Sequence, residues 1–163
     1  MKEPTTILFV CTGNLCRSPM AEGILKDRFR RDGKGGLYQV RSAGTWTQED
    51  LSASGLAVEA MREMGLDISA HRAHHLNRHD VARATLVIVM ERAHKEALLT
   101  EFPTAVGKTI LLSELVGEVY DIFDPYSSDS LVVYRRCAGE IDRLLSEGYA
   151  RLLELAGGNG RKT

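Results

Sequence analysis

Short apolar runs alternate along the chain with segments in which apolar residues recur at helical spacing. Four runs rich in β-branched residues indicate buried strands, at 5–11, 37–43, 86–90 and 109–112. The helical spacing predicts helices at 19–29, 53–64, 76–83, 91–99 and 130–156. Because strands alternate with helices, we expect one α/β domain over residues 1–156, with a four-stranded parallel sheet and helices on both faces. Residues 157–163 are expected to form a flexible tail.

The connection between the first strand and the first helix is the expected place for a site. Ser18 is a favoured type of N-cap residue, and Pro19 suits the first helical position because its missing N–H costs nothing there. In parallel sheets, ligands bind beyond the carboxyl ends of the strands, where loops lead into helix N-termini. This rule points to residues 11–18 before any motif is considered.

Composition narrows the class of protein. The 163 residues carry 21 Lys and Arg against 22 Asp and Glu, which gives a net charge of -1. A hydrophobic content of 44% is enough for a real core and excludes global disorder. Since neither sign of charge dominates, there is no bulk electrostatic case for binding nucleic acid or an anionic membrane.

Neither targeting nor anchoring is expected. The first four residues include an acid and a proline, and the apolar run behind them covers only 7–10, so we predict no signal peptide. No apolar run approaches the ~20 residues that a membrane span needs. Three cysteines are too few, and of the wrong parity, for a disulfide-stapled domain, which favours a reducing compartment and a cytoplasmic location.

Residues 10–19, V-C-T-G-N-L-C-R-S-P, have the chemistry of an oxyanion-binding loop. The segment is just long enough to curl around one tetrahedral anion with its N–H groups pointing inward. Gly13 and Asn14 tolerate the positive φ that tight curling requires, and Arg17 adds a planar fork for two oxygens. A helix N-terminus and a nearby arginine favour the thiolate form of cysteine, so Cys11 is the candidate nucleophile. The Ser18 hydroxyl is placed to donate to its sulfur.

A thiolate nucleophile has no proton to give to a leaving group, so such a site also needs an acid. Asp124 is the best candidate. It precedes Pro125, which favours an extended backbone and therefore a loop position. Tyr126, two residues later, is placed to wall a pocket. An isolated Asp-Pro pair is usually only a turn, and this interpretation depends on the cysteine loop.

The loop resembles that of the low-molecular-weight protein tyrosine phosphatases, whose pattern is V-C-x-G-N-x-C-R-S-P followed later by D-P-Y. The similarity continues through 41–46 and 70–73 and into the last helix. It implies that Cys11 becomes a phosphocysteine while Arg17 holds the phosphoryl oxygens. It also implies that Asp124 protonates the leaving phenol and then activates water.

The resemblance implies further roles. The backbone of Thr12, Gly13, Leu15 and Cys16 completes the phosphate-binding loop, and Trp46 and Tyr126 wall a phosphotyrosine ring. Tyrosine-phosphorylated proteins are the expected partners, phosphate and vanadate the expected inhibitors, and no metal or other cofactor is expected. A hydrogen-bond network that keeps the loop in shape is implied for Asn14, Ser18, Ser42 and His71.

Three other activities fit parts of the pattern. A protein arginine phosphatase on the same scaffold favours threonine where this chain has Leu15, and the bulky apolar residue suits a tyrosine pocket better. An arsenate reductase needs a distal cysteine pair, and only Cys137 lies outside the loop. A non-catalytic binding module would be expected to lack Cys11, Arg17 or Asp124, and all three are present.

Cys16 has two interpretations, a small loop filler or a partner for a reversible disulfide with Cys11 that protects the nucleophile against oxidation. A Cys16→Ser variant that recovers from peroxide as fully as the parent would argue against the disulfide.

Histidines 74, 75 and 79 raise the question of a metal, because His75 and His79 are spaced i, i+4. No carboxylate or cysteine completes a ligand set at suitable sequence spacing, so we expect a solvated basic surface instead. Nearby Arg72, Arg78 and Arg83 would help to attract phosphorylated proteins.

Overall fold

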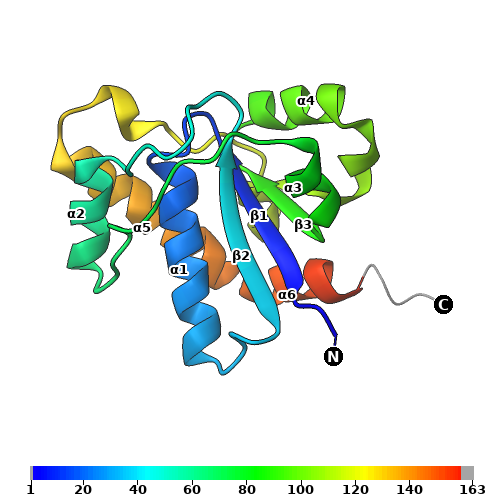
Figure 1. Ribbon diagram of the computed structural model, residues 1–163. Coiled ribbons are helices and arrows are strands. Elements are labelled where there is room, and N and C mark those ends of the chain that lie inside the picture. The colour runs from blue at the N-terminus through cyan, green and yellow to red at the C-terminus, as the bar shows by residue number, and fades with distance from the viewer. Residues whose placement is uncertain (1, 159–163) are drawn as a thin grey trace.

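The computed structural model describes residues 2–158, and its centre is a parallel sheet of four strands. The strands lie in the order β2-β1-β3-β4, and every neighbouring pair is parallel, which confirms the predicted sheet (Figure 1). The bounds agree closely with the predicted runs: β1 (Thr5–Cys11), β2 (Tyr38–Gly44), β3 (Leu86–Val89) and β4 (Thr109–Leu111). Because β1 lies inside the sheet, the carboxyl end that begins the cysteine loop is surrounded by neighbouring elements.

Helices cover both faces of the sheet, also as predicted (Figure 1). On β1, Ile7 and Phe9 point into one core and Leu8 and Val10 into the other, following the alternation of side chains along a strand. The first core is closed by α1 (Arg17–Arg31), α2 (Gly55–Glu63), α5 (Leu131–Glu147) and α6 (Tyr149–Gly158). The second is closed by α3 (Arg78–Arg83), α4 (Arg92–Glu101) and the short helix η1 (Pro103–Lys108).

The last helix was predicted incorrectly as one element at 130–156. The structure has two helices, α5 and α6, which are separated at Gly148. A Cβ added at this glycine would lie 2.5 Å from the Leu115 Cβ, so the chain passes too close to Leu115 for any side chain there. Helix α6 runs on through Gly157 to Gly158, and the remainder of the predicted tail lies outside the described residues.

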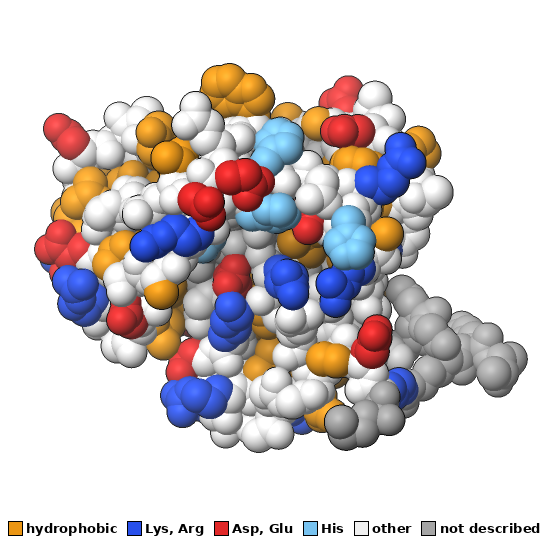
Figure 2. Space-filling model, in the orientation of Figure 1, with side chains coloured by type: hydrophobic (Ala, Val, Ile, Leu, Met, Phe, Trp, Pro, Cys, Tyr) orange, Lys and Arg blue, Asp and Glu red, His pale blue; other side chains and the backbone are white. Residues whose placement is uncertain are grey.

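Charged side chains and histidines gather in groups on one face of the molecule (Figure 2). Viewed as in Figure 1, Lys and Arg side chains gather over the region of β2, below a group of His, Asp and Glu side chains (Figure 2). None of the helices within residues 2–158 combines the length and the apolar character needed to cross a membrane.

Candidate active site

The loop that follows β1 depends on one residue in a left-handed conformation. Asn14 has φ 56°, which asparagine tolerates better than most side chains. We predicted positive φ at Gly13 as well, and that was wrong, because the positive-φ glycines within residues 2–158 are Gly33, Gly65 and Gly117. A single left-handed residue is therefore enough to turn the chain from the strand into α1.

Asn14 is held by hydrogen bonds on every side. Its Nδ2 donates to the Ser18 Oγ at 2.8 Å and to the Ser42 Oγ at 3.0 Å. Its Oδ1 accepts from the backbone N–H of His74 at 2.9 Å, and its carbonyl accepts from the His71 Nε2 at 2.8 Å. Burial lowers the pKa of His71, which favours the neutral ring. The structure thus brings together all four residues expected to support the loop.

Cys11 lies at the buried end of β1, with its Sγ 2.9 Å from the Ser18 Oγ. Because the Ser18 oxygen already accepts from Asn14, its own proton is free to point at the sulfur. The prediction that Ser18 is the N-cap was wrong. Helix α1 begins at Arg17 and its N-cap is Cys16, and no side chain of residues 2–158 caps it. The Ser18 hydroxyl therefore contacts the Cys11 thiol instead of capping the helix.

Arg17 is almost completely buried, at 1% exposure, and is held from two sides. Its Nη1 donates to the Ile122 carbonyl at 2.7 Å, and its Nη2 donates to the Glu91 Oε2 at 3.0 Å. The same Nη2 lies 3.4 Å from the Asp124 Oδ2. Within residues 2–158, its Nε–H is buried and has no hydrogen-bond partner. Buried donors are almost always paired, so this N–H is available to an acceptor from outside the described chain, such as a ligand oxygen or a water.

Asp124 stands at the mouth of the site, where its side chain is 44% exposed. Its Oδ1 accepts from the Tyr126 N–H at 3.1 Å and so caps the short helix η3 (Pro125–Ser127). The cap fixes the carboxyl group and leaves its other oxygen turned toward Arg17. A carboxyl group that is both positioned and exposed is suited to exchanging protons with a ligand and with water.

A pocket of about 690 Å³ joins these residues. Trp46 and Tyr126 stand at its rim, 81% and 62% exposed. Leu15 and Leu51 add apolar surface to the pocket lining. The pocket is lined by Cys11, Thr12, Gly13, Leu15, Cys16, Arg17, Trp46, Thr47, Gln48, Leu51, Asp124 and Tyr126. It therefore combines a polar floor at the loop with apolar and aromatic walls.

Two further residues behind the loop, Glu91 and His94, were not predicted from the sequence. The His94 Nδ1 accepts from the Glu91 N–H at 3.1 Å, which places the ring proton on Nε2. That nitrogen lies 2.8 Å from the Thr12 Oγ1 and 3.1 Å from the Glu91 Oε2. Glu91 thus links Arg17 to His94. Both residues follow the carboxyl end of β3, next to β1, where the rule for parallel sheets would have directed attention.

Gly44 was also missed. A Cβ at this position would lie 2.6 Å from the Thr12 carbonyl oxygen, so only glycine lets the end of β2 pass this close to the loop. Nothing in the local sequence distinguishes this glycine from an ordinary strand end.

We expect acid to destabilise the fold partly through His94. Burial, and then the positive charge of Arg17, lower the pKa of His94 from 6.5 to about 4. Between these values the unfolded chain binds a proton on this ring that the folded chain does not. The corresponding stability is complete above about pH 6.5 and is lost as the pH falls toward 4, by about 3 kcal/mol. Urea unfolding at several pH values should show a weaker acid dependence for His94→Asn than for the parent; equal dependence would contradict this.

The other two thiols are buried and free. The Cys16 Sγ lies 3.6 Å from the Tyr134 hydroxyl, and burial raises the pKa of Cys16 to about 11. Burial raises the pKa of Cys137 to about 12. Of the three cysteines, Cys11 alone is paired with a hydroxyl that belongs to the loop network.

Of histidines 74, 75 and 79, His74 takes part in ion pairs within residues 2–158. The His74 Nδ1 lies 3.1 Å from the Glu49 Oε2, and its Nε2 lies 2.7 Å from the Asp80 Oδ2. Asp80 lies six positions along the chain from His74, and Glu49 reaches the same ring from 25 positions away. Residues 2–158 contain no group of three or more His, Cys, Asp or Glu arranged to hold a metal ion.

A strand-loop-helix that presents a cysteine, a buried arginine and a nearby carboxyl group is typical of cysteine-dependent phosphatases. Comparison with known proteins identifies the family. A model described as low molecular weight phosphotyrosine protein phosphatase matches residues 6–154. The chain belongs to that family.

Relatives carry two kinds of name. A protein-arginine-phosphatase of Geobacillus stearothermophilus is 38% identical over 87% of this chain and 92% of its own length. A probable low molecular weight protein-tyrosine-phosphatase, EpsP, of Ralstonia nicotianae is 42% identical over 74% of this chain and 78% of its own. The solved low molecular weight protein tyrosine phosphatase from T. tengcongensis has a TM-score of 0.85 and 40% identity, and the match covers 90% of this chain and 99% of that one. Family membership alone therefore leaves the phosphorylated amino acid open.

Proposed function

We propose that this protein hydrolyses phosphotyrosine in proteins through a phosphocysteine intermediate. The observation that carries the proposal is the buried Arg17, whose Nε–H has no partner within residues 2–158 and which lines the same pocket as Cys11. A phosphoryl oxygen supplies the missing acceptor, because the guanidinium fork matches two oxygens of a phosphate group. The loop N–H groups and the start of α1 add to the positive field around it.

In the first step the Cys11 thiolate attacks phosphorus, and the bond from phosphorus to the phenolic oxygen breaks. Asp124 gives its proton to that oxygen, so tyrosine leaves as the neutral phenol. In the second step the Asp124 carboxylate takes a proton from water while the water oxygen attacks phosphorus. The sulfur–phosphorus bond breaks, and inorganic phosphate and the Cys11 thiolate are released. The Ser18 hydroxyl, 2.9 Å from the sulfur, stabilises the thiolate at both ends of the cycle.

Charge stabilisation accounts for this division of work. Phosphoryl transfer requires fixed donors around the equatorial oxygens more than it requires a strong base. Arg17 cannot rotate away, because Ile122 and Glu91 hold both of its terminal nitrogens. A donor fixed before the substrate arrives costs no reorganisation during the reaction.

The walls of the pocket favour an aryl substrate. Trp46 and Tyr126 are both largely exposed at the rim, where an aromatic side chain of the substrate can stack between them. Leu15 adds an apolar surface inside the pocket. Phosphoarginine is the second candidate substrate, because a relative that is 38% identical is named a protein-arginine-phosphatase. The charged guanidinium of phosphoarginine gains less from Leu15 than a phenyl ring does.

We expect Leu15→Thr to shift the preference toward phosphoarginine. The substitution removes apolar surface and adds a hydroxyl that bonds to a guanidinium N–H, so the ratio of kcat/KM for phosphotyrosine over phosphoarginine peptides should fall about tenfold or more. Leu51→Thr, at the more exposed part of the same wall, is the matched control and should change the ratio less. A parent protein that prefers phosphoarginine would refute our choice of substrate.

Two further assignments accompany the proposal. Phosphate and vanadate should bind at the loop as competitive inhibitors, which can be tested by their effect on KM. We also propose a cytoplasmic location, supported by the three free thiols and testable by cell fractionation.

A further inference from the structure

The outer edge of β2, which faces away from β1, is paired at Gly44 but carries other backbone groups that have no hydrogen-bond partner on the described chain. The Gly44 N–H donates to the His74 carbonyl at 2.8 Å, and its carbonyl accepts from Leu76 at 2.9 Å, so both groups point away from β1. In contrast, the Leu37 carbonyl and the Thr45 N–H bond to β1. Since backbone groups alternate between the two edges of a strand, the even-numbered residues of β2 face outward.

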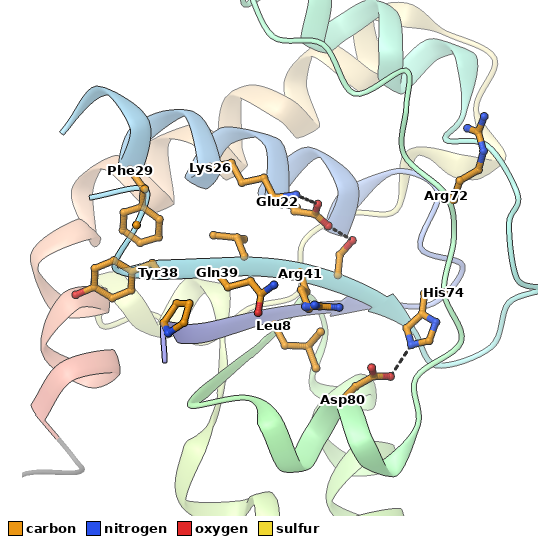
Figure 3. Close-up of a pocket in the computed structure, with 15 residues that line it drawn as sticks. Leu8, Glu22, Lys26, Phe29, Tyr38, Gln39, Arg41, Arg72, His74 and Asp80 are labelled. Atoms are coloured by element: carbon orange, nitrogen blue, oxygen red, sulfur yellow. Dashed lines mark hydrogen bonds and ion pairs between the residues drawn. The ribbon is translucent and has the colours of Figure 1, made fainter. Parts of the chain in front are cut away.

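Val40 and Ser42 are the outward-facing residues in the middle of this edge. Over residues 2–158 their N–H and C=O groups have no hydrogen-bond partner. They line a groove of about 680 Å³, which Figure 3 shows between α1 on one side and α3 on the other. Only at Gly44 does the 74–76 segment already pair with the edge. A strand that lay in the groove could therefore pair with Val40 and Ser42, and so extend the strand pairing that the 74–76 segment makes at Gly44.

The charge of the groove is positive once internal pairs are counted. Its carboxylates are already engaged, because Glu22 accepts from Lys26 and Ser42, and Asp80 accepts from His74 and from the backbone. Arg41 lines the groove and belongs to no ion pair within residues 2–158. The adjoining hollow adds His79 and Arg83 beside Arg41. Lys and Arg side chains accordingly gather on this face in Figure 2.

The two faces of the edge differ in character. Arg41 pairs in register with Leu8, whose side chain belongs to the core under α3 and α4. Val40 pairs with Ile7 and faces the core under α1, where Phe29 and Tyr38 stack at 4.4 Å between ring centroids. A strand added to this edge would therefore meet positive charge on one face and apolar and aromatic surface on the other.

We propose that this edge docks an extended segment of a partner protein, in which acidic and apolar residues alternate, as a fifth strand of the sheet. Main-chain hydrogen bonds to Val40 and Ser42 provide the attachment, and acidic side chains beside Arg41 provide the selectivity. A second copy of this chain is disfavoured, because an antiparallel pairing of two β2 edges centred between Val40 and Ser42 would place two Arg41 side chains opposite each other. Charged residues on a free edge commonly prevent such self-pairing.

The probe is a fluorescein-labelled peptide of alternating Glu and Val, added to the whole ¹⁵N-labelled protein. We expect saturable binding, with slowed amide exchange at Val40 and Ser42 and little change at Gln39 and Arg41, whose N–H groups already face β1. N-methylation of the peptide amides along one edge should abolish binding, whereas methylation along the other edge should not. A peptide of alternating Lys and Val should not bind.

Charge reversal tests the selectivity. Arg41→Glu should weaken binding about tenfold or more. Arg136→Glu, an exposed site on α5 outside the groove, should leave binding unchanged. Both variants should turn over a small aryl phosphate like the parent, which shows that they are folded.

Three outcomes would overturn the proposal. The first is that none of these peptides binds, in which case the basic residues only guard the edge. The second is that the peptide perturbs the amides of 12–18 and is displaced by vanadate, which would place it in the catalytic pocket. The third is that Val40 and Ser42 become protected as the protein alone is concentrated, which would identify a second copy as the occupant. None of these readouts depends on the substrate proposed above.

Discussion

Cys11→Ser should reduce the hydrolysis of a phosphotyrosine peptide by roughly 10⁴-fold or more, because the reaction then lacks its nucleophile. A serine hydroxyl at this position is not ionised near neutral pH, and no base beside it takes its proton, since the Ser18 Oγ is itself a hydroxyl. Binding of phosphate should survive, because Arg17 and the loop amides are unchanged. The measurement is phosphate release under single-turnover conditions, together with the affinity for inorganic phosphate.

Cys137→Ala is the matched control. This thiol is as buried as Cys11 but lies in the core, with its Sγ 3.7 Å from the Phe123 carbonyl. The substitution should cost stability and leave kcat within about twofold of the parent. Parent protein quenched during turnover should carry a phosphoryl group on Cys11. Activity that persists in Cys11→Ser would exclude the proposed mechanism.

The sheet and the loop could be predicted from sequence because each depends on a pattern within a short, continuous segment of the chain. Buried parallel strands appear as short apolar runs, and the loop is one uninterrupted segment between a strand and a helix. The break at Gly148 could not be predicted, since it depends on the approach of Leu115 from another element. Helical spacing continues on both sides of the break, and periodicity alone does not register it.

The candidate site shows the same division. Cys11, Arg17 and Ser18 are neighbours in the chain, so their types and spacing indicate their chemistry. Glu91 reaches Arg17 from 74 positions away. Its position after β3 indicates the edge of the sheet at which it lies, but no local pattern predicts its contact with Arg17. Ser18 was wrongly predicted as an N-cap because its hydroxyl could bond either to the helix end or to the Cys11 sulfur. In the structure it lies next to the sulfur. Local patterns thus predicted Cys11, Arg17 and Ser18, whereas the contacts of Glu91 with Arg17 and of His94 with Thr12 became visible only in three dimensions.

Asp124→Asn should separate the two halves of the reaction. With phosphotyrosine, loss of the general acid should reduce turnover by about 10²–10⁴-fold, because the poor leaving group must depart as a phenolate. With an aryl phosphate whose phenol is already acidic, formation of the phosphocysteine should slow far less. The second step still lacks its base, so the intermediate should accumulate. Rapid mixing should therefore show a burst of phenol followed by slow turnover.

A loss of activity that depends on the leaving group would distinguish proton transfer by Asp124 from a purely electrostatic role of this residue. Asp124 also lies 3.4 Å from Arg17, so a purely electrostatic role would slow both substrates equally. Asp129→Asn, an exposed carboxyl on the connection between η3 and α5, is the matched control and should behave like the parent. Equal losses with the two substrates and no burst would mean that Asp124 positions the arginine, and that another group protonates the phenol.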